Sequence, residues 1–448
     1  MILSKECVDG VLRHIDARRE DSIDLLKDLI RINSTNPNFP GVAREEVIGG
    51  ETRVNEILGE RLEEAGARTE WVAPDPERKN LVGVIKGTGG GRSLVLNGHV
   101  DTVPPAGLAA CSPAGLPKWT VTEPWSPLVR EDVLYGLGST DMKAGLVAAW
   151  LALQGLADAN QRPAGDVVVQ SVVGEERMEH EVGTTACLRA GFTGDAAVVL
   201  EPSSTPLPLT VSPVSAGNWV FRIVVPGRST HAGNRAGAIR PGGAGAALGV
   251  NAVEKGVDIL HALHALEDRW AISKAHPFFS PGFFTILPGL FHSDAGYPST
   301  SFFADYAVIQ CVLWYPPDEQ AEDVAKEVEV HIESACDPDP WLRINRPRFE
   351  WLKNCPPANT PWQHPFVRTI REANELVTGR HITDPTPLQP VAFGAVSDAS
   401  FLEAAGIPGV VYGPGDIRVA HTRDESVSIS EMVLAAKTLA RTIIAWCG

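Results

Sequence analysis

The sequence predicts an α/β protein with a mostly parallel mixed sheet and helices on both faces, plus an inserted α+β module of the ferredoxin-like type. Three observations lead to this prediction. Apolar strands alternate with helices in the first part of the chain, as in proteins with a parallel sheet. Near Pro213 the order changes to β-α-β-β-α-β, the order of a ferredoxin-like module. After about residue 353 the first rhythm returns, so one domain is split in sequence by the other.

The elements before residue 212 follow from their hydrophobic patterns. Ile23, Leu26, Leu29 and Ile30 recur at helical spacing, and a second helix ends at Gly66. Short continuous apolar runs indicate buried strands, and the stretch over 104–127, rich in Pro, Gly and Ala, indicates a long loop. The expected helices lie at 45–64, 142–156 and 184–190, and the expected strands at 80–86, 93–97, 134–136, 166–173 and 196–200.

The inserted module and the segment after it are assigned in the same way. An alternating strand at 220–225 precedes a long helix at 244–272, which follows a Gly-rich turn. Strands at 283–287, 303–315 and 348–352 and a helix at 318–335 complete the module, and helices at 364–377, 400–405 and 430–445 with a strand at 409–412 follow it. We therefore expect a split domain over 1–212 and 354–448 and an inserted domain over 213–353.

Composition excludes several classes of function. The 448-residue chain has 55 acidic and 39 basic side chains, a net charge of −16, which disfavours binding to nucleic acid or to an anionic membrane surface. The sequence contains no apolar run of about 18 residues, the length that a membrane-spanning helix needs. Its first residues lack the apolar stretch of a signal peptide. The seven cysteines are scattered and never spaced as CxxC. We expect a cytoplasmic protein with reduced thiols.

Five short pieces of the sequence carry residues able to bind metal or to move protons. His99 and Asp101 follow an apolar strand and face the same way, so Asp101 can fix the imidazole tautomer. Asp141 precedes a helix, where it is either an N-cap or a shared metal ligand. The other pieces are Glu175 and Glu176 after a buried strand, Glu201 after the next strand, and His421 in a loop. Each has an ordinary alternative: a surface pair, solvated acids or a structural histidine.

Taken together, these pieces favour a metal site. Charged residues at the carboxyl ends of parallel strands lie at one edge of the sheet, where α/β proteins bind their ligands. Two imidazoles, several carboxylates and no thiolate suit zinc, cobalt or manganese. A two-metal hydrolytic site needs five ligands and one free carboxylate as general base. The six residues available for these roles are His99, Asp141, Glu175, Glu176, Glu201 and His421.

Eight motifs occur in a fixed order along the chain. They are GHVDTVP at 98–104, LYGLGSTDMKAG at 134–145, GEE at 174–176, LEP at 200–202, GRSTHAG at 227–233, SDASFL at 397–402, YGPG at 412–415 and AHTRDES at 420–426. In this order they resemble the M20 family of metallohydrolases, which includes acetylornithine deacetylases, succinyl-diaminopimelate desuccinylases, aminoacylases and glutamate carboxypeptidases. The resemblance extends over about residues 20 to 445.

The resemblance implies two divalent metal ions, zinc in the first place and cobalt or manganese as alternatives. Asp141 would bridge the two ions. His99 and Glu201 would complete one site, and Glu176 and His421 would complete the other. The family pattern also implies a cis peptide bond after the bridging aspartate.

The resemblance also implies the catalytic residues and a role for the inserted module. Glu175 would be the general base, and Asp101 would support His99. The module would act as a lid that carries His231, a donor to the oxyanion of the transition state. In this family such a module often pairs two subunits, so we expect a homodimer.

The expected reaction is hydrolysis of the amide bond of a small N-acyl compound. Many relatives grip a substrate carboxylate with an arginine of the lid strand, but Trp314 takes that place here. An indole cannot form a bidentate pair with a carboxylate. Other candidate substrate contacts are Arg240, Asn251 and the backbone amides of Gly413 and Gly415. A metallo-dipeptidase or carboxypeptidase with the same site is an alternative, and a non-catalytic metal-dependent binding module is a more distant one.

Overall fold

The computed structural model describes residues 5–105, 119–204, 207–297 and 299–448. The chain forms two units. The first contains Met1–Ser215, Ala358–Pro385 and Val391–Gly448, and the second contains Ala216–Pro357 with Thr386–Pro390. The sequence-predicted metal ligands all belong to the first unit.

A six-stranded sheet forms the centre of the first unit. Its order is β1 (Arg68–Asp75), β2 (Arg78–Ile85), β6 (Val167–Val172), β3 (Leu94–His99), β7 (Ala197–Val199) and β12 (Gly409–Val411). The last four of these strands are mutually parallel, whereas β2 runs antiparallel to β6 and β1 antiparallel to β2. Every residue of β3 and β6 is buried, as expected of strands covered on both faces. The predicted mostly parallel mixed sheet is confirmed.

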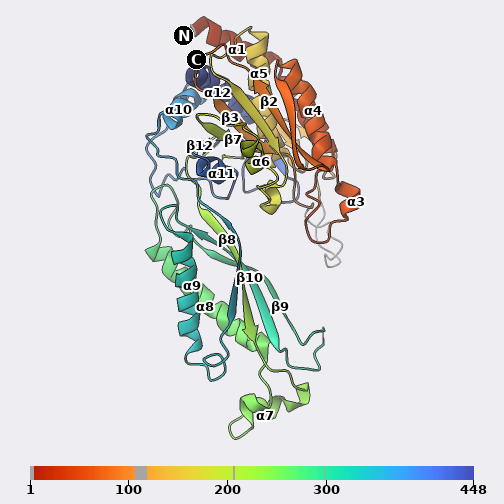
Figure 1. Cartoon of the computed structure of the whole chain (residues 1–448), viewed down its shortest axis with the longest axis vertical. Coiled ribbons are helices and arrows are strands. Elements are labelled where there is room, and N and C mark those ends of the chain that lie inside the picture. Colours follow the sequence, from red (N-terminus) through yellow and green to blue (C-terminus); the bar gives the residue numbers. More distant parts are fainter. Residues whose placement is uncertain (1–4, 106–118, 205–206, 298) are drawn as a thin grey trace. The chain divides into compact units, whose positions relative to one another are not determined.

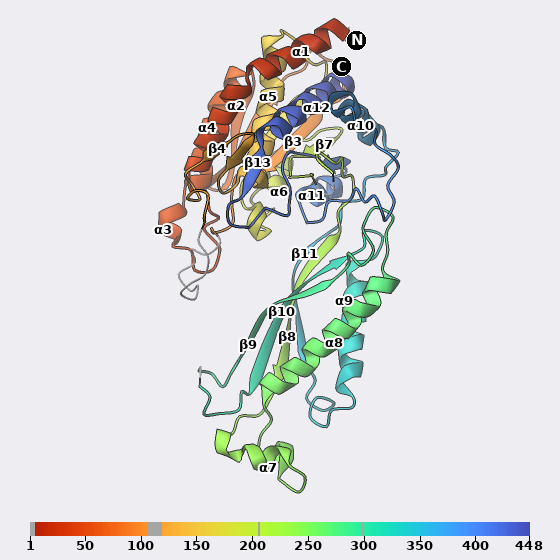
Figure 2. The same cartoon turned by 180° about the vertical axis from the view of Figure 1, so that it is seen from behind.

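Helices cover both faces of this sheet (Figures 1 and 2). One face carries α4 (Gly50–Glu64), α5 (Ala144–Asp158) and α12 (Ile429–Cys447), and the other carries α6 (Thr184–Arg189) and α11 (Ala399–Ala404). The outer helices are α1 (Lys5–Ala17), α2 (Arg19–Arg31), α3 (Arg44–Val47) and α10 (Pro365–Thr378). Residues 144–156 of α5 are all buried, because this apolar helix lies between the sheet and the outer helices.

Two local predictions for this unit were wrong. The single helix expected over 45–64 is divided into α3 and α4, because Ile48 has an extended ψ of 137° and Gly49 a left-handed φ of 80°. Strand β1 was not predicted at all. Its sequence, RTEWVAPD, is half-exposed at the edge of the sheet, so it lacks the continuous apolar run that marks a buried strand.

A small antiparallel sheet joins distant segments of the first unit. Its order is β13 (Ser426–Ser428), β5 (Val133–Tyr135) and β4 (Leu128–Arg130). Ser426 pairs with Tyr135 and Ser428 with Val133. The segment that follows His421 is therefore fixed to the segment that precedes Asp141. Much of the loop predicted over 104–127 falls outside the described residues.

The second unit is an antiparallel sheet packed against two long helices. The strand order is β11 (Arg348–Cys355), β8 (Gly217–Pro226), β10 (Tyr306–Tyr315) and β9 (Ile286–Asp294). Alternate side chains of β8 and β10 pack with α8 (Ala252–Ser273) and α9 (Ala321–Cys336) into one apolar core. A short helix, α7 (Arg235–Ile239), precedes α8. The order β8-α8-β9-β10-α9-β11 confirms the predicted ferredoxin-like module.

The second unit differs from its prediction at several boundaries; strand β10, for example, begins at Tyr306 rather than at residue 303. Strand β9 begins at Ile286 rather than at residue 283. Helix α8 begins at Ala252 rather than at residue 244, because Gly245 has a left-handed φ of 59° and Asn251 caps the helix. Within the described ranges, no helix combines the length and the apolar character that crossing a bilayer requires.

Candidate metal centre

The predicted ligands converge at the carboxyl ends of the parallel strands. His99 is the last residue of β3, and Glu201 follows β7 by two residues. Glu175 and Glu176 lie in η2 (Glu175–Arg177), a short 3₁₀ helix after β6. Asp141 lies in the turn that leads into α5, and His421 in the loop after β12. Five separate segments thus place their side chains at one edge of the sheet, where open α/β sheets bind ligands.

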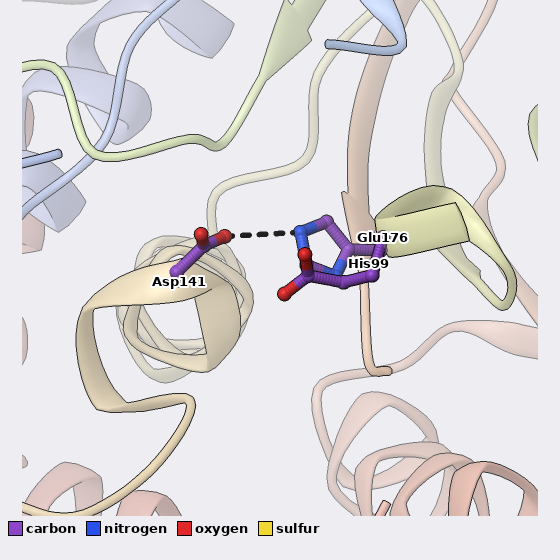
Figure 3. A group of neighbouring side chains, drawn as sticks. All are labelled: His99, Asp141 and Glu176. Carbon is purple, nitrogen blue, oxygen red and sulfur yellow. Dashed lines mark hydrogen bonds and ion pairs between the residues drawn. The ribbon is translucent and has the colours of Figure 1, made fainter. Parts of the chain in front are cut away.

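Asp141 lies between the two histidines. Its Oδ1 atom is 3.1 Å from Nε2 of His99, and its Oδ2 atom is 3.2 Å from Nε2 of His421. Figure 3 shows the first of these contacts, with Glu176 beside it. The peptide bond between Asp141 and Met142 is cis, as the resemblance implied. One carboxylate therefore offers one oxygen to each of two neighbouring positions.

The remaining carboxylates divide between the two histidines. Oε1 of Glu201 is 3.5 Å and Oε2 of Glu175 is 3.8 Å from Nε2 of His99. Oε2 of Glu176 is 2.9 Å from Nε2 of His421. Ligand atoms lie within 4.8 Å of one another in two groups, one of His99, Asp141 and Glu176 and one of His99, Glu175 and Glu201. By distance alone, Glu175 could therefore bind an ion as well as the predicted ligands could.

Asp101 supports this centre in two ways. Nδ1 of His99 is 2.9 Å from the backbone carbonyl of Asp101 and 3.5 Å from its carboxylate. A proton on Nδ1 directed at that carbonyl leaves Nε2 as the lone-pair atom that faces Asp141. The two oxygens of Asp101 accept the backbone N–H groups of Glu175 and Glu176, each at 3.2 Å. Asp101 thus orients both the imidazole and the turn with the paired glutamates.

The electrostatics of the centre are those of crowded carboxylates. Burial, together with repulsion from Asp141 among others, raises the pKa of Glu201 to about 8. Burial also raises the pKa of Glu175 well above its usual value and that of Glu176 above it. Burial acts in the same direction on Asp141, but hydrogen bonds from His421 and His99 hold the pKa of Asp141 below its usual value. The four carboxylates therefore need positive charge close by.

The two histidines respond in the opposite sense. The His421 side chain is 53% exposed; partial desolvation lowers its pKa, but Glu176 and Asp141 raise the pKa to about 11. Burial likewise lowers the pKa of His99, but hydrogen bonds with Asp101, Asp141 and Glu201 raise it well above its usual value. The shifts of the histidines and of the glutamates thus have a common cause, the concentration of carboxylates at this centre.

This donor set fits divalent cations. It offers imidazole nitrogens and carboxylate oxygens without a thiolate, the mixture that zinc, cobalt and manganese accept. Oε1 of Glu176 is buried and has no hydrogen-bond partner among the described residues, although a buried carboxylate oxygen normally has one. In the described part of the chain, the ion pairs of these four carboxylates involve histidines and neither lysine nor arginine. Divalent cations would satisfy both the charge and the unpaired oxygen.

Sequence reasoning missed a buried polar network behind Asp101. The amide of Asn36 donates to Oδ2 of Asp101 at 2.9 Å. The Arg78 guanidinium, 1% exposed, donates to Glu51 at 2.6 and 2.8 Å and to Glu179 at 2.7 Å. Burial raises the pKa of Asp101, but hydrogen bonds from His99 and Asn36 and the charge of Arg78 hold it below its usual value. Nothing in the sequence around an arginine at the start of a strand indicates that its side chain is buried.

The predicted amide donors of Gly413 and Gly415 already have acceptors. Gly413 N–H donates to Oγ of Ser203 at 3.2 Å, and Gly415 N–H donates to the Glu431 carboxylate at 2.9 Å. A Cβ at Gly415 would lie 1.9 Å from Oγ1 of Thr140, and one at Gly413 would lie 2.4 Å from the carbonyl oxygen of Leu200. The structure thus corrects the prediction: these glycines allow close packing of the loop beside the Asp141 segment and present no free amide donor.

The remaining candidates belong to the second unit. His231 is exposed, and its Nδ1 accepts a hydrogen bond from Gly233 N–H at 3.0 Å. Asn251 caps α8, and its side-chain oxygen accepts the N–H of Val253 at 3.2 Å. Arg240 is exposed at the end of α7, and Trp314 is half-buried in β10 opposite Asn218 of β8. Asn251 thus has a structural role that the sequence did not reveal.

Comparison with known proteins identifies the family. The family model described as "Peptidase family M20/M25/M40" matches residues 95–445. The chain belongs to this family. The M20 family is metal-dependent, and its hydrolases act on amide C–N bonds.

Individual relatives match this M20 hydrolase over nearly its whole length. An N-formyl-4-amino-5-aminomethyl-2-methylpyrimidine deformylase from Halalkalibacterium halodurans is 30% identical over 451 residues, which cover 98% of this chain and 97% of the relative. The structure of the di-peptidase Dug1p from Saccharomyces cerevisiae matches with a TM-score of 0.71 at 14% identity, over 98% of each chain. YXEP of Bacillus subtilis, described as a dinuclear metal binding peptidase, matches with a TM-score of 0.64 at 13% identity, over 96% of this chain and 99% of YXEP.

Proposed function

We propose that this M20 hydrolase is a dinuclear-metal amidohydrolase that removes the acyl group from a small N-acyl compound. The observation that carries the proposal is the position of Asp141, with one oxygen toward His99 and the other toward His421. A carboxylate in that position suits two cations better than one. A family model that covers most of the chain supports the same reaction class.

The ligands divide into two sets that share the bridging aspartate. One set is His99, Asp141 and Glu201, and the other is His421, Asp141 and Glu176. Zinc is the ion we propose, with cobalt or manganese able to occupy the same ligands. When bound, two divalent ions polarise an amide carbonyl and lower the pKa of water toward neutrality.

We assign Glu175 as the general base. Its carboxylate lies 3.8 Å from Nε2 of His99, and its backbone N–H donates to Asp101, so its backbone is anchored beside the ligands. The family pattern leaves this glutamate outside both ligand sets. In the reaction it accepts a proton from the attacking water and then donates a proton to the leaving amine.

We assign His231 as the donor that stabilises the oxyanion. Because Nδ1 accepts the N–H of Gly233, the neutral imidazole carries its proton on Nε2. Nε2–H is then a donor that the exposed side chain can present to a developing negative charge. This geometry supports the role that the GRSTHAG motif suggested.

The substrate we propose lacks a carboxylate next to the scissile bond. Trp314 stands where many relatives place the arginine that grips a carboxylate, and indole offers no such charge. The Halalkalibacterium halodurans relative is named as a deformylase of an N-formyl aminomethylpyrimidine, a compound whose name includes no carboxylate. We therefore propose N-formyl and N-acetyl derivatives of aminomethyl heteroaromatic amines as the first substrates. A dipeptidase with the same metal centre is the second candidate. The di-peptidase Dug1p has a similar fold.

A substrate panel on metal-reconstituted protein tests this function. The protein is stripped with a chelator, reloaded with Zn²⁺ or Co²⁺, and assayed against N-formyl, N-acetyl and N-succinyl amines beside dipeptides. We expect hydrolysis of the neutral N-acyl amines, lost on chelation and restored on reloading. Hydrolysis of dipeptides alone would favour the second candidate, and no hydrolysis of any member in the presence of metal would contradict the proposed class.

We also propose a homodimer formed through the second unit. Strand β9 is an edge strand of its sheet, and it exposes Leu287, Leu290 and Phe291 at 54%, 50% and 38%. Exposed apolar side chains on an edge strand, whose outer side has no neighbouring strand in its sheet, favour pairing with a second copy. Light scattering after size-exclusion chromatography tests this proposal: a mass of twice the chain is expected, and a Leu290→Lys variant should be monomeric. A monomeric parent protein would contradict it.

A further inference from the structure

A buried carboxylate outside both ligand sets lies directly beside the bridging aspartate. Glu425 is 1% exposed, four residues after His421 in the AHTRDES motif. Among the described residues its carboxylate forms no ion pair, and its hydrogen-bond partners are backbone N–H groups. A buried carboxylate is costly unless it is well satisfied, so its partners indicate what it does.

Those partners form the turn that carries Asp141. Oε1 of Glu425 accepts the N–H of Thr140 at 2.9 Å and the N–H of Asp141 itself at 3.1 Å. Oε2 accepts the N–H of Gly138 at 3.1 Å. Three N–H groups of one turn thus share this single carboxyl group as their acceptor. The direction of the Asp141 backbone is thus set by Glu425.

A second contact ties the two segments together through the backbone. The carbonyl oxygen of Glu425 accepts the N–H of Gly136 at 2.9 Å, and β13, which begins at the next residue, pairs with β5. His421 lies in the same short segment, with a left-handed φ of 57°, a conformation that non-glycine residues adopt when their surroundings fix it. The chain that supplies one histidine therefore holds the chain that supplies the shared aspartate.

We propose that Glu425 is a positioning residue of the metal centre. Its carboxylate fixes the turn over 138–141 so that the two oxygens of Asp141 point toward His99 and His421 respectively, and its anchorage sets the distance between His421 and Asp141. This inference rests on the proposed dinuclear function. Groups behind the ligands typically change metal affinity or activity about 10- to 100-fold when removed.

The two oxygens of Glu425 are both needed. A glutamine in its place has the same shape but a single acceptor oxygen, so its NH₂ group would face an N–H donor on one side. The change therefore disturbs the turn without creating a cavity. Asp424, the preceding residue, provides a matched control, because its carboxylate accepts the N–H groups of Thr120 and Val121, which carry no ligand.

The experiment compares Zn²⁺ and Co²⁺ binding by the metal-free full-length protein and its Glu425→Gln, Glu425→Asp and Asp424→Asn variants. We expect Glu425→Gln to raise the apparent Kd for the ions about 10- to 100-fold, to alter the visible spectrum of the Co²⁺-loaded protein, and to lower kcat more than it raises KM. Glu425→Asp, which keeps both carboxyl oxygens but is one methylene shorter, should fall between Gln and the parent. Asp424→Asn should bind both metals as the parent does.

Each outcome decides the inference. Parent-like metal affinity and Co²⁺ spectrum in Glu425→Gln, even with a lower melting temperature, would overturn it, since a purely structural role predicts that result. Equal losses in Glu425→Gln and Asp424→Asn would also overturn it. If the Gln variant does not fold, the Asp variant is judged by the same criteria. Failure of the parent protein to bind two ions would overturn the proposed function itself, and this inference with it.

Discussion

The two units of the chain differ in how their candidate residues are held. In the first unit, buried strand ends and tight turns bring residues from positions 99 to 421 within hydrogen-bond distance of one another. In the second unit, His231 and Arg240 are exposed, and Asn251 is occupied as a helix cap. A parallel sheet gathers the ends of its strands at one edge, whereas no comparable rule gathers loop residues. The difference predicts large, metal-dependent effects for substitutions in the first unit and smaller, metal-independent effects in the second.

The largest effect is expected for Asp141→Ala. Because both histidines contact this one carboxylate, its removal should abolish binding of the two ions and reduce hydrolysis to the uncatalysed background. Metal analysis after gel filtration and an activity assay measure both quantities. A variant that retains two ions and turns over substrate would show that Asp141 is not a metal ligand.

Glu175→Gln should lower kcat by about 10²- to 10⁴-fold, because the amide cannot accept the proton of the attacking water. Both ions should stay bound, since the family pattern places Glu175 outside the ligand sets. Steady-state kinetics with metal analysis of the same sample test this, and Glu403→Gln serves as the control, because Glu403 accepts the Asn359 N–H instead. Loss of one ion from Glu175→Gln would make Glu175 a ligand, as its distance from His99 permits.

His231→Ala should lower kcat by about 10²- to 10³-fold, the usual effect of losing one oxyanion donor, without changing the metal content. His292→Ala is the control, because His292 is an exposed histidine of the same unit paired with Asp294. Parent-like activity of His231→Ala would remove His231 from the mechanism.

Mixed subunits locate the site that His231 serves. Consider a dimer of one Glu175→Gln subunit and one His231→Ala subunit. If His231 serves the site of the partner subunit, the site of the His231→Ala subunit keeps its own Glu175 and receives an intact His231 from the other subunit. Mixing the two variants should then restore activity that neither has alone. No recovery in a sample shown to contain mixed dimers would place His231 in the site of its own chain.

Asp101→Asn should weaken metal binding by about 10- to 100-fold. An asparagine has one acceptor oxygen, but the two Asp101 oxygens accept N–H groups from both Glu175 and Glu176. Isothermal titration of the metal-free variant with Zn²⁺ measures the change. Unchanged affinity would mean that the backbone carbonyl of Asp101, which contacts His99, provides the whole support.

The smallest effect is expected for Asn251→Ala. Loss of the N-cap of α8 should lower the free energy of unfolding by about 1 kcal/mol and leave kcat/KM unchanged. Urea unfolding and the hydrolysis assay measure the two effects separately. A tenfold fall in kcat/KM at parent-like stability would return Asn251 to the list of substrate contacts.

The sequence predicted those features that depend on the order and ends of helices and strands. The convergence of His99, Glu176 and Glu201 follows from their places after buried strands, and the ferredoxin-like order follows from hydrophobic spacing. Three-dimensional packing was needed for the rest. The partners of Arg78 lie 27 and 101 residues away in the chain. The acceptors of the Gly413 and Gly415 amides, Ser203 and Glu431, lie outside the YGPG motif, so the motif alone does not reveal that these donors are occupied.

The number of divalent ions bound per chain tests the central claim most directly. The metal-free protein is titrated with Zn²⁺ while hydrolysis of an N-formyl amine is followed in the same samples. Two ions per chain are predicted, with activity rising as they bind and with neither ion retained by Asp141→Ala. Full activity with no bound metal, or a parent protein that binds no Zn²⁺ at all, would contradict the account.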